Sequence, residues 1–228
     1  AMILAAEYAW NSGKTDLEHL PYNWDEEFRR VWGQRALDCT PRKGFTLDLS
    51  QAGNVRLADD EKGGGWMGLG PDHDLSAVPT GEVRLKSDTF NIALSVVRLA
   101  SAFDSEAEYP VSFALPVCRK AGALLFLHTT QWTDKAKRKI GSYKINYEDG
   151  TSVDVELIYG ANITSWIDQR SVSGAERVWG GRTKADERVS LQRMEWENPN
   201  PEKLIRSIEF SSAATEAAPV LLAVSAIE

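Results

Sequence analysis

The chain of 228 residues is long enough to bury a sizeable core, and its hydrophobic content of 43% is ordinary for a globular protein. Its net charge of −7 argues against nucleic acid as a partner, because affinity for the phosphate backbone comes from Lys and Arg. No apolar run approaches the roughly 20 residues that a membrane helix needs, so no membrane partner is predicted.

One helix is predicted near the start of the chain, over residues 25–32. The apolar residues there have the spacing of one helix face, at Trp24, Phe28, Val31 and Trp32. Acidic residues suit the N-terminal end of this helix, and Gly33 suits its stop. Such a helix exposes two tryptophans in isolation, so we expect it to dock on another part of the protein.

The stretch around Pro41 is typical of a linker and divides the chain into residues 1–40 and 41–228. Cys39 lies just before this proline, and Cys118 is the other cysteine of the chain. Two cysteines are too few for a disulfide scaffold, although they could form one bridge in an oxidising compartment. Two idle thiols are the favoured alternative.

After the linker the pattern changes from helical to β. Short runs that alternate apolar and polar residues, or are continuously apolar, predict strands at 45–49, 83–85, 92–99, 111–115 and 124–128. The clearest signal is a pair of such runs, 143–147 and 153–157, on both sides of Asp149-Gly150, which is typical of a β-hairpin. The apolar run 217–226 fits a buried strand. Many short strands predict a mainly β fold, an antiparallel β-sandwich.

The first loop with candidate ligand contacts contains Trp66, which follows three glycines. The bare backbone there would let a ligand approach the indole; the alternative is a tryptophan folded under its own loop. Asp72, His73 and Asp74 follow a Gly-Pro turn. The carboxylates of Asp72 and Asp74 could bind Ca²⁺ or sugar hydroxyls. The alternative is turn chemistry, in which they accept hydrogen bonds from nearby backbone N–H groups.

Five further candidates lie in or beside predicted loops: His128, Trp132, Trp166, Arg170 and Trp179. His128 ends an apolar strand, where it either lines a binding surface or is a satisfied histidine packed between sheets. Trp132 follows a polar stretch that suits sugar recognition. Trp166 and Arg170 could grip a glycan together, or form a hydrophobic plug with a surface ion pair. Trp179 lies beside two glycines and is a further candidate for a ligand contact on a loop.

A pair of glutamates near the C-terminus invites comparison with a glycosidase active site. Glu195 and Glu197 share one face of a predicted strand, whereas Met194 and Trp196 share the other face and are expected in the core. Glycosidase chemistry needs two carboxylates about 5–10 Å apart that face a cleft. Strand neighbours on a solvated face rarely meet this condition, so the pair is not favoured as catalytic.

Five phrases in the second part of the chain belong together. They are Gly64-Gly65-Trp66 with the segment 70–75, Leu125 to Trp132, Tyr143 to Val155, Glu195 to Pro199, and Ala218 to Ala223. Together they resemble a galactose-binding-like β-sandwich domain of the kind attached to bacterial glycoside hydrolases, over about residues 45–228. Cys118 stands where this resemblance leads us to expect glycine or another small residue. The segment Ala5 to Asn11 resembles the end of the (β/α)8 barrel in hexosaminidase-like enzymes of glycoside hydrolase family 20.

These resemblances imply the C-terminal part of a secreted or periplasmic bacterial glycoside hydrolase, in which residues 1–40 are a remnant of the catalytic domain. Residues 41–228 are then a jelly-roll β-sandwich that binds carbohydrate without catalysis. Because the loops of a sandwich gather at its two ends, we expect Trp66, His73, Asp74, His128 and Trp132 as one cluster of contacts, with Trp166, Arg170 and Trp179 less firmly part of it. The expected partners are a glycan and the parent catalytic domain. No cofactor is expected, and a structural Ca²⁺ at Asp72 and Asp74 stays an open alternative.

Two alternatives to carbohydrate binding stay open. The first is a structural domain that braces the catalytic barrel and binds no glycan, which the two tryptophans of the predicted helix support. The second is a catalytic glycosidase fragment, which ranks last because the sequence has no nucleophile elbow and no phosphate loop.

Overall fold

The structure is a computed structural model that describes residues 42–105 and 108–228. The described residues form no helix, and therefore none long and apolar enough to cross a membrane. The helix predicted over residues 25–32 lies outside this part. The strands are β1 (Gly44–Leu47), β2 (Val55–Arg56), β3 (Gly81–Leu85), β4 (Asp88–Ile92), β5 (Ser95–Arg98), β6 (Ser112–Arg119), β7 (Ala123–Gln131), β8 (Lys139–Tyr147), β9 (Ser152–Ile158), β10 (Glu176–Arg182), β11 (Arg188–Glu197), β12 (Ile205–Ser212) and β13 (Ala218–Ile227).

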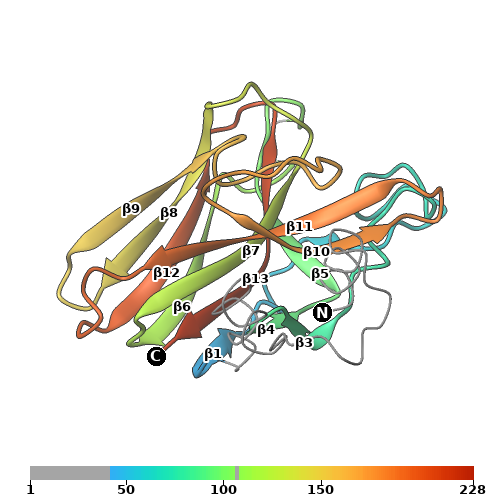
Figure 1. The fold of residues 1–228 in the computed structure, drawn as a ribbon. Coiled ribbons are helices and arrows are strands. Elements are labelled where there is room, and N and C mark those ends of the chain that lie inside the picture. The colour runs from blue at the N-terminus through green and yellow to red at the C-terminus, as the bar shows by residue number, and fades with distance from the viewer. Residues whose placement is uncertain (1–41, 106–107) are drawn as a thin grey trace, which may run out of the picture. The chain divides into compact units, whose positions relative to one another are not determined.

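The strands form three sheets, in which every pair of neighbouring strands is antiparallel (Figure 1). The largest sheet has the order β10-β11-β7-β13-β5-β2, and β1 also pairs with β13. The second sheet has the order β6-β12-β8-β9, and β3 pairs with β4 as a separate hairpin. The prediction of a mainly β, antiparallel fold is therefore confirmed.

The centre of the largest sheet is buried on both faces, because β7 carries apolar side chains on each side. On one face Phe126 stacks on Tyr143 of β8, with ring centroids 4.0 Å apart, in a core that both larger sheets share. On the other face Leu125 and Leu127 pack in a second core with side chains of the β3–β4 hairpin. The alternation of side chains along a strand produces this division.

The hairpin predicted at Asp149-Gly150 is confirmed as the turn between β8 and β9. Gly150 has a φ of +84°, a conformation that glycine adopts without steric cost. The Asp149 carboxylate accepts hydrogen bonds from the amide and the hydroxyl of Thr151, at 3.0 and 2.6 Å. The run 217–226 is confirmed as the buried strand β13.

The single strand predicted over residues 92–99 is wrong. The chain forms two strands there, because β4 ends at Ile92 and β5 begins at Ser95. β4 pairs with β3, whereas β5 pairs with β13 and β2. The chain leaves one sheet and enters another at this point, and it exposes Leu94 in the connection. Periodicity of apolar residues does not reveal such a change of partner.

Cys118 lies at the end of β6 with a φ of +52°, in the left-handed region that favours glycine. This backbone conformation gives a physical reason for the glycine or small residue expected at this position. Its thiol is free and exposed. Cys39 lies outside the described residues, so a bridge between the two cysteines stays a prediction.

Candidate functional site

Two surface features lie at opposite ends of the ladder that β7 and β13 form. The ladder runs from the pair Ala123 and Ile227 to the pair Gln131 and Ala218. We call the surface around Phe103 and Trp132, beyond Gln131, the aromatic end. We call the cavity between β1 and the β3–β4 hairpin, near the other end, the polar groove. In Figure 1 the loops after β5 and β7 lie at the top, and β1, β3 and β4 lie at the bottom.

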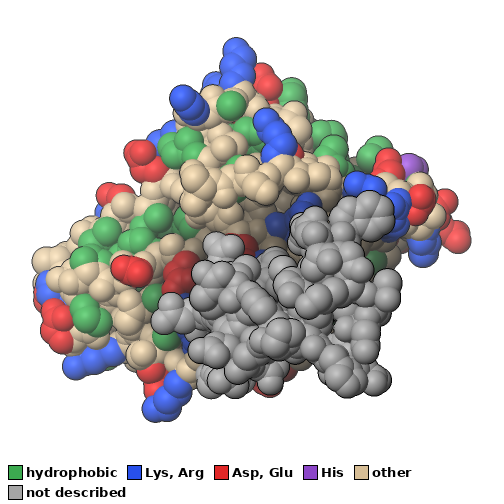
Figure 2. Space-filling view, viewed as in Figure 1, with side chains coloured by type: hydrophobic (Ala, Val, Ile, Leu, Met, Phe, Trp, Pro, Cys, Tyr) green, Lys and Arg blue, Asp and Glu red, His purple; other side chains and the backbone are tan. Residues whose placement is uncertain are grey.

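The aromatic end presents two large side chains that the fold leaves exposed. Trp132 is 39% exposed and Phe103 is 62% exposed, and their rings meet edge to face with centroids 5.9 Å apart. The Thr130 hydroxyl donates a hydrogen bond of 2.8 Å to the carbonyl oxygen of Trp132, whose φ is +63°. Hydrophobic side chains are visible at this upper end of the molecule in Figure 2.

One buried guanidinium holds the backbone beside both aromatic residues. Arg98, which is 3% exposed, donates from Nε to Gln131, the residue before Trp132. It also donates to both carboxylate oxygens of Asp104, the residue after Phe103, at 2.9 and 2.6 Å. Burial raises the pKa of Asp104, but the hydrogen bonds from Arg98 and Ser101 outweigh it and hold this pKa below its usual value. Arg98 therefore links the two segments that carry the exposed pair.

Trp66 and Trp166 lie beneath the surface. Trp66 is 1% exposed, Trp166 is also buried, and their rings meet edge to face at 5.7 Å. The carbonyl oxygen of Trp66 accepts a hydrogen bond from the Gln131 side chain. A buried indole has no free face for a sugar ring, so the surface role expected for these two tryptophans is corrected. The burial of Trp66 fits its alternative, a tryptophan folded under its own loop, and the burial of Trp166 fits the hydrophobic plug that was its alternative.

The acidic residues of the glycine-rich loop hold its backbone. Asp74 is buried and accepts hydrogen bonds of 2.9 Å from the amides of Asp59 and Ser76. Asp59 in turn accepts from three loop amides, those of Met67, Leu69 and Gly70. This is the turn chemistry that was the alternative for Asp74, which corrects its expected role as a ligand contact. Asp72 is exposed, and no group of three or more His, Cys, Asp or Glu in the described ranges is placed to hold a metal ion.

His128 is a buried histidine between the two larger sheets. Its Nε2 lies 3.0 Å from the carbonyl oxygen of Asn162, and its Nδ1 lies 3.1 Å from the hydroxyl of Tyr143. Burial lowers the pKa of His128 to about 4, so the ring is neutral at pH 7. Because a carbonyl only accepts, Nε2 carries the proton and Nδ1 accepts from Tyr143. A side chain so enclosed cannot line a binding surface, which corrects that expectation.

The other predicted contacts lie apart from Trp132. His73 bridges its loop to Glu187, in the turn between β10 and β11, at 2.9 Å, and this contact raises the pKa of His73. Arg170 is exposed and donates hydrogen bonds to both carboxylate oxygens of Asp168. Trp179 lies within β10, half-buried, with its ring against Gly181, and so does not stand on a loop. The five contacts expected as one cluster are therefore separated. Trp132 lies at the surface, Trp66 and His128 are buried in the core, and His73 and Asp74 lie in the glycine-rich loop.

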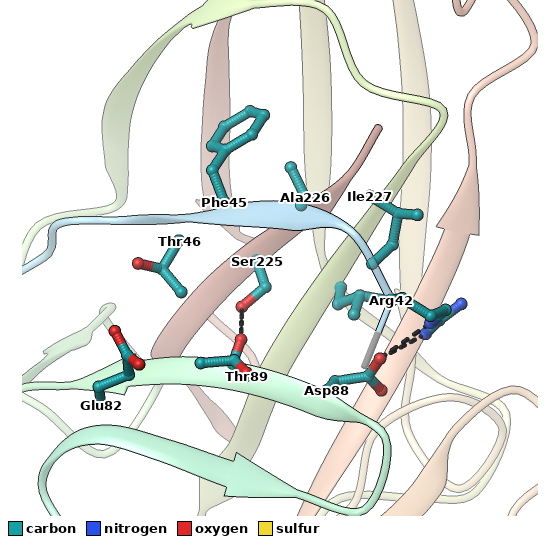
Figure 3. A pocket seen from close by; sticks show the side chains of 11 residues that line it. Arg42, Phe45, Thr46, Glu82, Asp88, Thr89, Ser225, Ala226 and Ile227 are labelled. Carbon is teal, nitrogen blue, oxygen red and sulfur yellow. Dashed lines mark hydrogen bonds and ion pairs between the residues drawn. The ribbon is translucent and has the colours of Figure 1, made fainter. Parts of the chain in front are cut away.

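The polar groove has a volume of about 460 Å³. Thr46 lies on one side of it, and Glu82 and Thr89 of the β3–β4 hairpin lie on the other (Figure 3). Buried Asp88 accepts from Arg42 at 2.9 Å and also pairs with Arg193. Sequence reasoning missed this groove, because no local pattern links residues of β1, β3, β4 and β13.

Glu195 belongs to the same charge network as Asp88. Both of its carboxylate oxygens accept hydrogen bonds from Arg42, at 2.5 and 3.1 Å. The hydrogen bond to Glu195 is the largest cause that raises the pKa of Arg42, and the contact with Asp88 adds to it. Glu195 thus contributes to the network that holds Arg42 against β4 and β11. Trp196 packs against the first core, as predicted.

In comparisons with known proteins, no family model matches the chain, and no curated protein matches it.

Proposed function

We propose that the chain is a non-catalytic carbohydrate-binding domain, and that the aromatic end binds the glycan. The single observation that carries this proposal is the exposed pair of Trp132 and Phe103 on loops that β5 and β7 support. A sugar ring has apolar faces of C–H groups, and an aromatic ring with one face towards solvent suits such a partner. The resemblance to accessory domains of secreted bacterial glycoside hydrolases supports the same function.

A β-sandwich of jelly-roll type is the architecture that we propose for this domain. The shared core of the two larger sheets supports it. So does the order of the strands, because the chain passes from one sheet to the other between β5 and β6, β6 and β7, β7 and β8, β9 and β10, β11 and β12, and β12 and β13. In sandwiches the loops gather at the two ends, where binding residues are commonly carried.

Trp132→Ala tests the proposal. On an array of oligosaccharides from mucins and plant polysaccharides, the wild-type chain should bind at least one glycan, and this substitution should weaken the affinity by about tenfold. The melting temperature should change little, because Trp132 is partly exposed. Leu94→Ala, which also shortens an exposed apolar side chain but away from the aromatic end, is the matched control. Equal affinities of the wild type and Trp132→Ala would show that the pair does not bind the glycan.

The second candidate function is a structural domain that braces a catalytic barrel. One observation favours it: Arg42, which directly follows Pro41 of the predicted linker, is fixed to Asp88 of β4 and Glu195 of β11. These contacts anchor Arg42 on the domain. Under this hypothesis Trp132→Ala leaves every glycan signal unchanged, whereas loss of the Arg42 contacts loosens the junction and increases its cleavage by a protease.

A further inference from the structure

We propose that the polar groove is a second binding site, and that its ligand is a hydroxyl-rich molecule that carries a primary amine, such as an oligosaccharide of glucosamine. The site lies beside the end of the β7–β13 ladder that is opposite to the aromatic end, since Leu125, Ser225 and Ala226 line it. It is therefore independent of the function proposed for Trp132.

The groove has the size and the walls of a preformed ligand site. Its volume of about 460 Å³ lies within the range of roughly 300–1,000 Å³ that is common for small-molecule sites. One wall is fixed because β1 pairs with β13. The other wall is fixed because the Ser225 hydroxyl donates a hydrogen bond of 2.6 Å to the carbonyl oxygen of Thr89. Because both walls are already fixed, a ligand would have to order few protein groups, and the entropy cost of binding would be small.

The two carboxylates of the groove differ in their partners. Asp88 is buried and pairs with Arg42 and Arg193, so its charge is neutralised within the protein. Glu82 is exposed on β3 and makes no hydrogen bond or ion pair with a described residue. The groove thus presents one carboxylate whose charge is available to a ligand. An ammonium group is its natural complement, through a charge-assisted hydrogen bond.

Two hydroxyl groups supply further recognition. Thr46 faces away from the first core, because Phe45 and Leu47 on either side of it pack against that core. Thr89 shares a face of the hairpin with Glu82, since it lies opposite Arg84, two residues along β3. Neither hydroxyl makes a hydrogen bond with another described side chain, and each can both donate and accept. A ligand hydroxyl can donate a hydrogen bond to either threonine hydroxyl or accept one from it.

Titration of the full chain with the glucosamine hexamer, followed by amide chemical shifts and by calorimetry, tests this inference. The fully N-acetylated hexamer is the matched neutral probe, because it keeps the ring and the hydroxyls but has no ammonium groups. We expect the amine form to bind about tenfold more tightly, and to shift the resonances of Thr46, Glu82 and Thr89. Equal affinity of the two forms, or no binding of the amine form at millimolar concentration, would overturn the inference.

Glu82→Gln should remove this tenfold preference and leave binding of the neutral hexamer unchanged. The control is Glu148→Gln, a substitution of an exposed glutamate in the β8–β9 turn outside the groove, which should keep the preference. Thr46→Val should weaken both probes alike, because it removes a hydroxyl contact and no charge. If Glu82→Gln has no effect while Trp132→Ala abolishes binding, the amine form binds at the aromatic end and the groove inference fails. A failure of glycan binding at Trp132 leaves the groove result intact.

Discussion

The aromatic end and the polar groove flank the same β7–β13 ladder, but they place charge and apolar surface in opposite ways. At the aromatic end, the ion pair of Arg98 and Asp104 is buried and two aromatic rings are exposed. At the groove, Arg42 is partly exposed and pairs with two carboxylates, those of Asp88 and Glu195, and the surface carries hydroxyls and Glu82. A buried ion pair in which each member has a single charged partner depends on that partner, whereas a network of several charges tolerates the loss of one member. The two ends should therefore respond differently to the same kind of substitution.

The largest effect on stability should come from Arg98→Met. This change leaves the Asp104 carboxylate with no guanidinium in a nearly buried place, which typically costs about 3–5 kcal/mol. Urea unfolding of the variant measures the loss. Arg182→Met is the matched control, because Arg182 pairs with Asp186 and both side chains are exposed, and such a surface pair contributes about 1 kcal/mol or less. Losses of similar size in the two variants would contradict the comparison.

Acid should destabilise the protein through His128, which lies in the β7–β13 ladder between the two ends. The pKa of this side chain is about 6.5 when unfolded and about 4 when folded, so between these values the unfolded chain binds more protons. Stability from the neutral ring is therefore present above pH 6.5 and is lost as the pH falls towards 4, by roughly 3 kcal/mol. The difference in unfolding free energy between wild type and His128→Gln should shrink by this amount over that window. A constant difference would show that His128 is not buried in the neutral form.

Asp88→Asn should cost less than Arg98→Met, at about 1–2 kcal/mol. The substitution keeps the shape of the side chain and removes its charge. Arg42 retains Glu195, and Arg193 retains Glu176 and Glu195, so neither arginine is left without a carboxylate. The same urea measurement applies. A loss as large as that of Arg98→Met would mean that the groove network behaves as a buried pair.

What the sequence could predict depended on how local the cause was. The hairpin at Asp149-Gly150 and the buried strand β13 follow from neighbouring residues alone, and both were predicted. The place of Trp66 depends on Gln131, 65 positions along the chain, which binds its carbonyl oxygen. Nothing within the glycine-rich loop indicates this distant hydrogen bond, so an indole open to a ligand and an indole folded under the loop both remained alternatives.

The two candidate sites show the same limit. Trp132 was predicted as a ligand contact, but its partner Phe103 was missed, because a phenylalanine in an irregular loop has no periodic signal. The groove joins Arg42 to Asp88 across 46 positions and to Glu195 across 153. Contacts at such distances along the chain arise from the pairing of strands, and a single sequence does not display them.

The smallest effect on stability should come from Phe103→Leu at the aromatic end. Phe103 is 62% exposed, so its removal forfeits little buried area, and an edge-to-face pair contributes about 1 kcal/mol even in favourable settings. We therefore expect a loss of about 0.5 kcal/mol or less in urea unfolding. Binding should respond more strongly, because Trp132 then lacks the ring that meets it at 5.9 Å and fixes its orientation. A glycan that wild type binds should bind severalfold more weakly to this variant. A large loss of stability with unchanged affinity would instead show that the exposed pair holds the loops together and takes no part in binding.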